Sequence, residues 1–265
     1  MAEDTPTTKL IPVLGEEGVD RLAQARVLVL GCGGVGSSCV EALARGGAGT
    51  LALVDRDVVS PSNLNRQAIA FTSTIGKKKA DVMRGMVLDI NPSARVIIRD
   101  DFVLAENVAE VVDGVIAELG GRVDFVVDAI DTISTKLALA QLAEERGFSL
   151  ISSMGGAMKL HPECLRVADI YDTVNCRLSR IMRKECRRRG IRHLTVLYSC
   201  EEVKAATSKP GTERRERSGM GTMPYMPPIM GQTIAGYVIR QITGVGADSV
   251  RSDGVALQGS RAGRR

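Results

Sequence analysis

A cluster of glycines, GCGGVG, follows an apolar run and opens an amphipathic stretch. Glycines at a strand-to-helix turn let backbone N–H groups approach a phosphate, and the positive end of the helix dipole favours the negative charge. The candidate phosphate-binding residues are Gly31, Gly33, Gly34 and Gly36. By itself the cluster is equally compatible with a tight turn that serves only helix–strand packing.

Acidic and polar side chains follow a second apolar run, in the stretch LALVDRDVVSPSNLNRQ. Asp55 lies about 20 residues beyond the glycines, where a Rossmann carboxylate reaches the ribose hydroxyls, and Asp57 is assigned to the same nucleotide site. This much fits NAD and ATP equally. Asn63, Arg66 and Lys79 favour ATP, because cations stabilise the charge that develops when a triphosphate is cleaved. Either cation taken singly is also compatible with an ordinary surface charge.

Two carboxylates, Asp128 and Asp131, close a later apolar run in VVDAIDT. Mg²⁺ keeps most of its waters and needs only one or two protein oxygens, so a carboxylate at a strand end beside a phosphate is a suitable ligand. Asp131 is the predicted Mg²⁺ ligand, whereas Asp128 is expected to cap the following helix or to hold the glycine turn. The predicted catalytic residues are Arg66, Lys79 and Asp131.

Short β-branched runs alternate with longer amphipathic stretches, which predicts a Rossmann-like α/β fold: a mostly parallel sheet with helices on both faces. Strands are expected at 26–31, 50–55, 94–100, 125–130 and 149–154, with helices near 35–45, 77–90, 106–119 and 135–147. Such sheets bind ligands at the carboxyl ends of their strands, beside a reversal of strand order. The candidate residues should therefore meet at one edge of the sheet.

The second half of the chain is expected to extend the same sheet with antiparallel strands. Strands are predicted at 164–173 and 194–203, a basic amphipathic helix at 178–190 and an apolar helix at 226–244. One domain is predicted over residues 1–248, with a nucleotide-binding part at about 22–155, a substrate and dimer part at about 156–248, a mobile loop at 201–219 and a disordered basic tail at 249–265.

The composition is that of a soluble protein with a real core: 44% of the 265 residues are hydrophobic, only 3% are aromatic and Trp is absent. The scarcity of aromatic residues argues against a stacking surface for single-stranded nucleic acid. The six cysteines form no C-x-x-C pair, so we expect neither zinc nor a disulfide framework. No apolar run approaches about 18 residues, which predicts an intracellular, cytoplasmic protein without signal peptide or membrane span.

Five motifs in order resemble the adenylating domain of the ThiF/MoeB and ubiquitin-activating enzyme superfamily. They are the glycine cluster, the DRDVVSPSNLNRQ stretch, IGKKKADVM, INP and DFVVDAIDT. The resemblance implies attack of a carboxylate on the α-phosphate of ATP, with the glycine loop, Asn63, Arg66 and Lys79 on the phosphates, Asp55 on the ribose and Asp131 on Mg²⁺. It thereby favours ATP over NAD.

Residues 151–191, 194–202 and 221–244 resemble one branch of that superfamily, which dehydrates threonylcarbamoyladenosine in tRNA. The likeness covers roughly residues 9–244, and the two C-x-x-C motifs typical of sulfur-carrier activation are absent. The resemblance implies ATP-dependent cyclisation through an acyl-adenylate, with tRNA as substrate, a homodimer, and a possible sulfur-relay protein as a further partner. The alternatives are an adenylyltransferase for a ubiquitin-like sulfur carrier, an NAD-binding oxidoreductase or sensor, and an inactive scaffold.

The dehydratase interpretation assigns a role to the basic stretch after residue 176, which holds seven Arg and one Lys against a single Glu up to His193. Its tRNA-binding candidates are Arg183, Lys184, Arg187, Arg188 and Arg189. A solvated helix face is the alternative. Cyclisation onto an internal nitrogen requires no thioester, so Cys200 is not expected to be catalytic. Relatives carry an Arg before the first strand that reaches the partner subunit's ATP, whereas here Lys9 and Arg21 are the only basic candidates.

Overall fold

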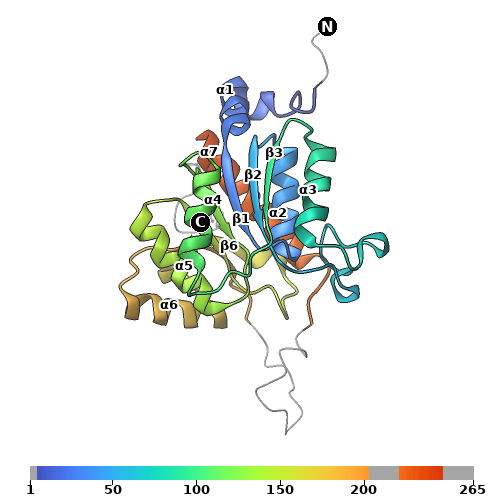
Figure 1. Ribbon diagram of the computed structural model, residues 1–265. Coiled ribbons are helices and arrows are strands. Elements are labelled where there is room, and N and C mark those ends of the chain that lie inside the picture. Colours follow the sequence, from blue (N-terminus) through green and yellow to red (C-terminus); the bar gives the residue numbers. More distant parts are fainter. Residues whose placement is uncertain (1–4, 203–220, 247–265) are drawn as a thin grey trace, which may run out of the picture.

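The fold is described from a computed structural model, which describes residues 5–202 and 221–246 (Figure 1). In this part of the chain, one sheet has seven strands in the order β3-β2-β1-β4-β5-β7-β6. The strands are β1 Arg26–Leu30, β2 Thr50–Val54, β3 Arg95–Arg99, β4 Phe125–Asp128, β5 Leu150–Ser153, β6 Leu165–Asp169 and β7 Thr195–Ser199. The order runs outward in both directions from β1, so the reversal of strand order lies between β1 and β4.

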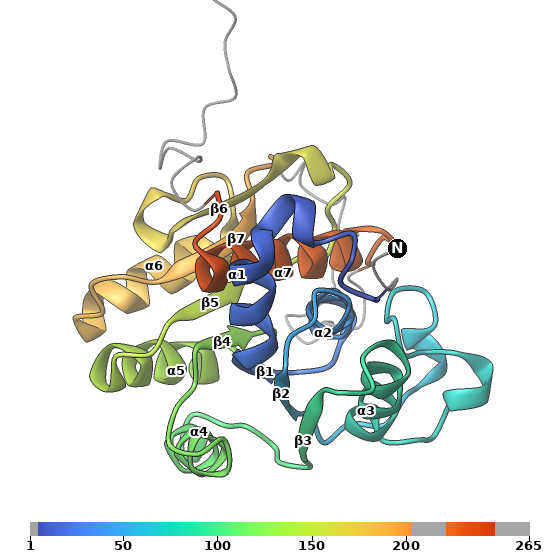
Figure 2. The same ribbon diagram turned by 90° about the horizontal axis from the view of Figure 1, so that it is seen from above.

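Helices cover both faces of the sheet (Figure 2). The bounds are α1 Ile11–Gln24, α2 Gly34–Arg45, α3 Lys79–Ile90, α4 Val108–Glu118, α5 Ile133–Arg146, α6 Arg177–Arg189 and α7 Met226–Thr243. Helices α1, α2, α3 and α7 lie on one face, and α4, α5 and α6 on the other. Alternate residues of β1 divide accordingly: Val27 and Val29 join the core under α2 and α7, whereas Leu28 and Leu30 join the core under α4 and α5.

The structure confirms the predicted Rossmann-like class, and the five predicted strands of the first half correspond to β1–β5. The extension differs in detail, because β7 pairs parallel with β5 and only β6 runs antiparallel among the described strands. Helix α1 was not predicted; it contains Pro12 and is kinked at Gly15, which has a φ of 71°, so its helical signal is weak. Most of the predicted loop at 201–219 and the predicted tail at 249–265 lie outside the described residues.

Within the described residues, no helix is both long and apolar enough to cross a membrane.

Helix α7 is pressed against α2, the helix that the glycine cluster opens. A Cβ atom added at Gly231 would lie 2.3 Å from the carbonyl oxygen of Val35 and 2.8 Å from the amide nitrogen of Cys39. Only a glycine allows this approach without displacing the backbone of α2. The late helix therefore fixes the position of the helix N-terminus that the nucleotide site needs.

Replacing Gly231 by alanine is expected to lower the free energy of unfolding by about 1–3 kcal/mol, the usual cost of overpacking. Gly236→Ala in the same helix is the matched control, because a Cβ there meets only the Arg240 side chain, at 3.5 Å. That substitution should be neutral or stabilising by up to about 1 kcal/mol. Urea unfolding of both variants measures the difference, and equal effects would contradict the tight contact.

Candidate functional site

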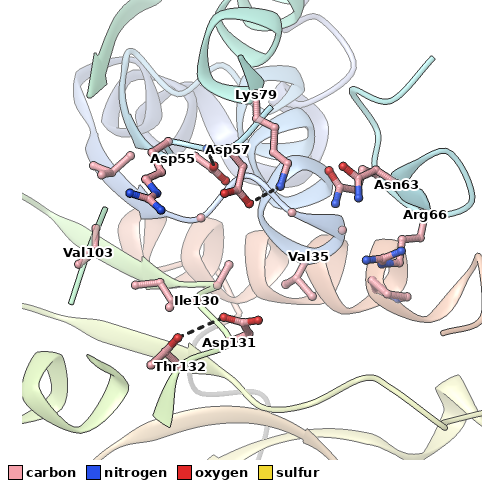
Figure 3. Close-up of a pocket in the computed structure, with 18 of the residues that line it drawn as sticks. Val35, Asp55, Asp57, Asn63, Arg66, Lys79, Val103, Ile130, Asp131 and Thr132 are labelled. Atoms are coloured by element: carbon pink, nitrogen blue, oxygen red, sulfur yellow. Dashed lines mark hydrogen bonds and ion pairs between the residues drawn. The ribbon is translucent and has the colours of Figure 1, made fainter. Parts of the chain in front are cut away.

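A cavity of about 430 Å³ opens at the carboxyl ends of the central strands, at the reversal of strand order (Figure 3). Its walls combine the glycine loop, the residues after β2 and β4, and two segments from the second half of the chain. The predicted site residues that line it are Gly31, Gly33, Gly34, Asp55, Asp57, Asn63, Arg66, Lys79 and Asp131. Gly36 lies behind the loop as a packing residue.

The glycine loop is shaped by two close backbone approaches. Gly31 has a φ of 94°, and a Cβ there would lie 2.9 Å from the carbonyl oxygen of Ala129. A Cβ at Gly36 would lie 1.8 Å from the carbonyl oxygen of Gly31, which no side chain tolerates. Helix α2 begins at Gly34, so its first N–H groups face the cavity and provide an anion-binding end.

Asp55 is held against this loop. Its carboxylate accepts hydrogen bonds from the amide of Cys32 at 2.6 Å and from the amide of Asp57 at 2.8 Å. Burial raises the pKa of Asp55 above its ordinary value, and the hydrogen bond from Cys32 opposes that rise. The carboxylate is thus fixed in direction at the cavity wall, as the predicted ribose contact requires.

Lys79 is the first residue of α3 and its side chain is buried, with 8% of it exposed. Its Nζ lies 2.8 Å from an oxygen of Asp57, and its amide donates to the Asp57 carbonyl at 2.9 Å. Asp57 therefore serves as the counterion of Lys79 in this structure. A buried ammonium with one carboxylate partner keeps two donors for an incoming phosphate.

Asn63 and Arg66 line the cavity on the same side as the end of the Lys79 side chain, away from Val103 (Figure 3). The Arg66 Nη1 donates to the Ser62 carbonyl and to Asn65 Oδ1, both at 2.9 Å. Asn63 is buried, and its Oδ1 accepts from the Ser60 amide at 3.0 Å. Both side chains are therefore oriented before any ligand arrives.

Asp131 and Asp128 have separate environments. Asp131 is exposed on the cavity wall, where its Oδ1 accepts from the Thr132 hydroxyl at 3.3 Å. Asp128 is fully buried and paired with Lys136 at 3.0 Å, and it does not line the cavity. The expectation that Asp128 caps the next helix is wrong, because α5 has Thr132 at its N-cap with no side-chain cap. No group of three or more potential metal ligands occurs among the described residues, and a Mg²⁺ site of one or two protein carboxylates would not form such a group.

An apolar wall on the other side of the cavity was missed by sequence reasoning. It includes Phe102, Val103 and Ile130, and the guanidinium of Arg56 lies 3.8 Å from the centre of the Phe102 ring. The only available signal was the position of DFV directly after a predicted strand. An apolar surface of this kind suits a purine base.

Residues far along the chain complete the cavity. Gly156, Ala157, Thr222 and Pro227 line it, and the Asn65 side chain donates to the Thr222 carbonyl at 3.0 Å. Sequence spacing could not place them, because their proximity depends on β5 and α7 taking their positions in the finished sheet. These residues form the part of the cavity wall that the second half of the chain contributes.

Residues predicted to act outside the cavity lie elsewhere. Lys184, Arg187, Arg188 and Arg189 are exposed on α6, whereas Arg183 donates to the carbonyl and hydroxyl oxygens of Thr173, both at 2.6 Å. Helix α6 packs beside α5 on the flank of the molecule (Figure 2).

Cys200 does not line the cavity, and its amide donates to the Cys164 carbonyl at 3.0 Å across the β6–β7 pair. Residues 5–10, which include exposed Lys9, precede α1 at the opposite end of the sheet from the cavity (Figure 1).

The fold and the cavity together define an α/β protein of the nucleotide-binding type, with a glycine loop, cations and carboxylates around one cavity at the reversal of strand order. The sequence matches the pattern of the ThiF family over residues 7–261, and the chain belongs to that family.

Named relatives extend the comparison. The chain is 34% identical to the tRNA threonylcarbamoyladenosine dehydratase of Bacillus subtilis over 86% of this chain and 91% of the relative. It is 30% identical to dehydratase 2 of Saccharomyces cerevisiae over 88% of this chain, but it spans only 55% of that longer protein. The crystal structure of the Escherichia coli dehydratase in complex with ATP is similar, with a TM-score of 0.77, 27% identity, and 90% and 94% of the two chains covered.

We expect the affinity for AMP to fall as the pH drops through the raised pKa of Asp55, because protonation removes the charged acceptor for the ribose hydroxyls. Asp55→Asn should weaken AMP binding about tenfold at neutral pH, the worth of one hydrogen bond to a charged group, and should remove that pH step. Isothermal titration from pH 4 to pH 8 on both proteins measures the effect. Protonation of the AMP phosphate affects the parent chain and the Asp55→Asn variant alike. Identical pH profiles for the two proteins would therefore contradict the assignment of Asp55 to the ribose.

Proposed function

We propose that this chain catalyses the ATP-dependent dehydration of threonylcarbamoyladenosine in tRNA to its cyclic hydantoin form. The observation that supports it best is the cavity itself, in which a nucleotide site borders a second wall formed by residues 156, 157 and 222. The relatives from Bacillus subtilis and Escherichia coli carry the name of this activity, and the latter has been crystallised with ATP and with AMP.

The reaction consists of two displacements. A carboxylate oxygen of the threonylcarbamoyl group attacks the α-phosphate and pyrophosphate leaves, which gives an acyl-adenylate. A nitrogen of the same group then attacks the acyl carbon, AMP leaves with the former carboxylate oxygen, and the nitrogen loses its proton. The net change in the nucleoside is the loss of one water.

The side chains of this cavity serve the first displacement. Arg66 and Lys79 supply positive charge, and this charge stabilises the transition state more than the ground state because negative charge accumulates on the phosphates during attack. Asn63 donates to a phosphate oxygen, and Asp55 holds the ribose so that the α-phosphate faces the second wall. Mg²⁺, held by Asp131, would neutralise phosphate charge when bound.

Incubation of the protein with ATP and tRNA that carries threonylcarbamoyladenosine should convert the nucleoside to a product lighter by one water, as measured by mass spectrometry. Arg66→Ala and Lys79→Ala should each slow this conversion on the order of 10²–10³-fold, as expected for loss of one group that stabilises the transition state. Arg45→Ala is the control, because this exposed cation on α2 lies outside the cavity and pairs with Glu41. Pyrophosphate exchange stimulated by a ubiquitin-like carrier protein, and not by this tRNA, would instead support sulfur-carrier activation.

The basic face of α6 is our proposed contact for the tRNA backbone. It presents Lys184, Arg187, Arg188 and Arg189 to solvent, and among the described residues only Arg188 of these four has an acidic partner, Glu185 at 3.7 Å. Arg187 also lies over the ring of Tyr171, at 5.3 Å from its centre. A dense set of exposed cations gains affinity by releasing counterions from the polyanion.

The triple variant Lys184→Gln/Arg187→Gln/Arg189→Gln should weaken tRNA binding and reduce the slope of log affinity against log salt by about one for each phosphate that is no longer neutralised. The matched control is Arg45→Gln/Arg84→Gln/Arg122→Gln, which removes the same charge from other parts of the surface. Fluorescence anisotropy with labelled tRNA between low and physiological salt measures both slopes. Equal slopes for the two triple variants would mean that α6 has no special role.

A homodimer is the proposed assembly. Exposed apolar side chains in residues 58–75 support it: Val58, Leu64, Phe71 and Ile75 are each at least 39% exposed. Sedimentation equilibrium, with a mass twice that of one chain as the expected result, tests the assembly.

A sulfur-relay protein is a further proposed partner, and co-purification with the intact chain tests it.

A further inference from the structure

A charged network lies directly behind the cavity and has no role in the mechanism given above. Lys136 of α5 and Asp128 at the end of β4 are 1% and 0% exposed, and Lys136 is among the largest fully buried side chains of the described residues. Desolvation makes such a pair expensive, and an apolar replacement of similar volume is often neutral or stabilising. Its value to this protein therefore lies in geometry and not in stability.

One end of the network shapes the wall that carries Asp131. The Asp128 Oδ1 accepts from the amide of Ile130 at 3.1 Å, which turns the chain out of β4 and into the cavity. The amide of Ala129 donates to the Leu30 carbonyl at 2.9 Å, so the turn also packs on the end of β1. Residues 129–132 are the part of the cavity wall that this carboxylate holds, and we name them the nucleotide lip.

The other end of the network holds the neighbouring part of the wall, which follows β5. The Lys136 Nζ donates to the Ser153 carbonyl at 2.8 Å and lies 3.3 Å from the Ser152 hydroxyl, both at the end of β5. The Ser152 hydroxyl in turn donates to the Asp128 Oδ2 at 2.5 Å. The chain then continues through residues 154–157, the acceptor lip, of which Gly156 and Ala157 line the cavity.

We infer that Lys136 is a positioning residue, which sets the distance between the nucleotide lip and the acceptor lip and so aligns the incoming carboxylate with the α-phosphate. This inference rests on the proposed function. Its three N–H donors all have partners in the network, one on Asp128 and two on the end of β5. Because every polar atom is satisfied, the arrangement has one preferred geometry, unlike an apolar contact at the same place. Lys136 is buried and touches no substrate.

The test compares Asp128→Asn/Lys136→Met with the parent chain. Both charges are removed together, so that neither remains buried alone, and the Asn side chain keeps an acceptor for the Ile130 amide. Affinity for ATP should change less than about threefold, because the glycine loop, Asp55 and Lys79 remain. The maximal rate of tRNA-dependent AMP release should fall on the order of 100-fold, the cost of misplacing reacting groups by about 1 Å.

A control separates positioning from loss of stability. Leu139→Ala, in the same helix, removes a fully buried side chain outside the network. It should lower the free energy of unfolding by about 2–5 kcal/mol. At temperatures below the melting transition of this variant, its maximal rate should equal that of the parent chain. Ser152→Ala keeps the ion pair and removes two hydrogen bonds, those of the Ser152 hydroxyl with Asp128 and with Lys136, so an intermediate rate is expected. It remains informative if the double variant does not fold. A double variant that keeps its maximal rate within threefold, or a rate that falls equally in Leu139→Ala, would overturn the inference.

Hydrogen exchange makes the inference testable without substrate. In Asp128→Asn/Lys136→Met, the amides of residues 129–132 and 154–157 should both exchange faster, although they follow different strands, while the amides of α2 keep their rates. Acceleration at neither lip, or at one alone, contradicts the coupling whatever the reaction is. If the parent chain leaves threonylcarbamoyladenosine unchanged, the proposed function fails and the exchange result still stands.

Discussion

The backbone contact between Gly31 and Gly36 is the constraint on which the rest of the site depends. The first turn of α2 approaches the end of β1 so closely that a Cβ at Gly36 would lie 1.8 Å from the Gly31 carbonyl oxygen. This approach aims the N-terminus of α2 into the space between β1 and β4, where strand order reverses. The proposed phosphate site, the placement of Asp55 and the position of α7 all depend on it.

The two cations near that helix end have partners within the protein. Lys79 has its counterion in Asp57, and Arg66 is held by uncharged oxygens of Ser62 and Asn65. The cations are therefore oriented without being neutralised by a second carboxylate. An anionic ligand meets donors that already point toward it, which is how preorganised electrostatics lowers a barrier.

The walls of the cavity are joined through the interior. The pair of Lys136 and Asp128 links the ends of β4 and β5, and Asn65 reaches the segment before α7 through the Thr222 carbonyl. The nucleotide side and the acceptor side of the cavity are thus linked by these hydrogen bonds. A displacement at one wall is transmitted to the other because the core between them is close-packed.

The sequence by itself determined the class of fold, the five strands of the first half and many of the residues that line the cavity, because these depend on local pattern and on motifs with definite spacing. Only the tertiary structure decided that Asp57 pairs with Lys79, that Asp128 is buried with Lys136 instead of capping α5, and that Arg183 holds Thr173. It also brought Thr222 and Pro227 to the cavity and turned β7 parallel to β5. Each of these depends on which distant segments meet in the sheet, and no local spacing carries that information.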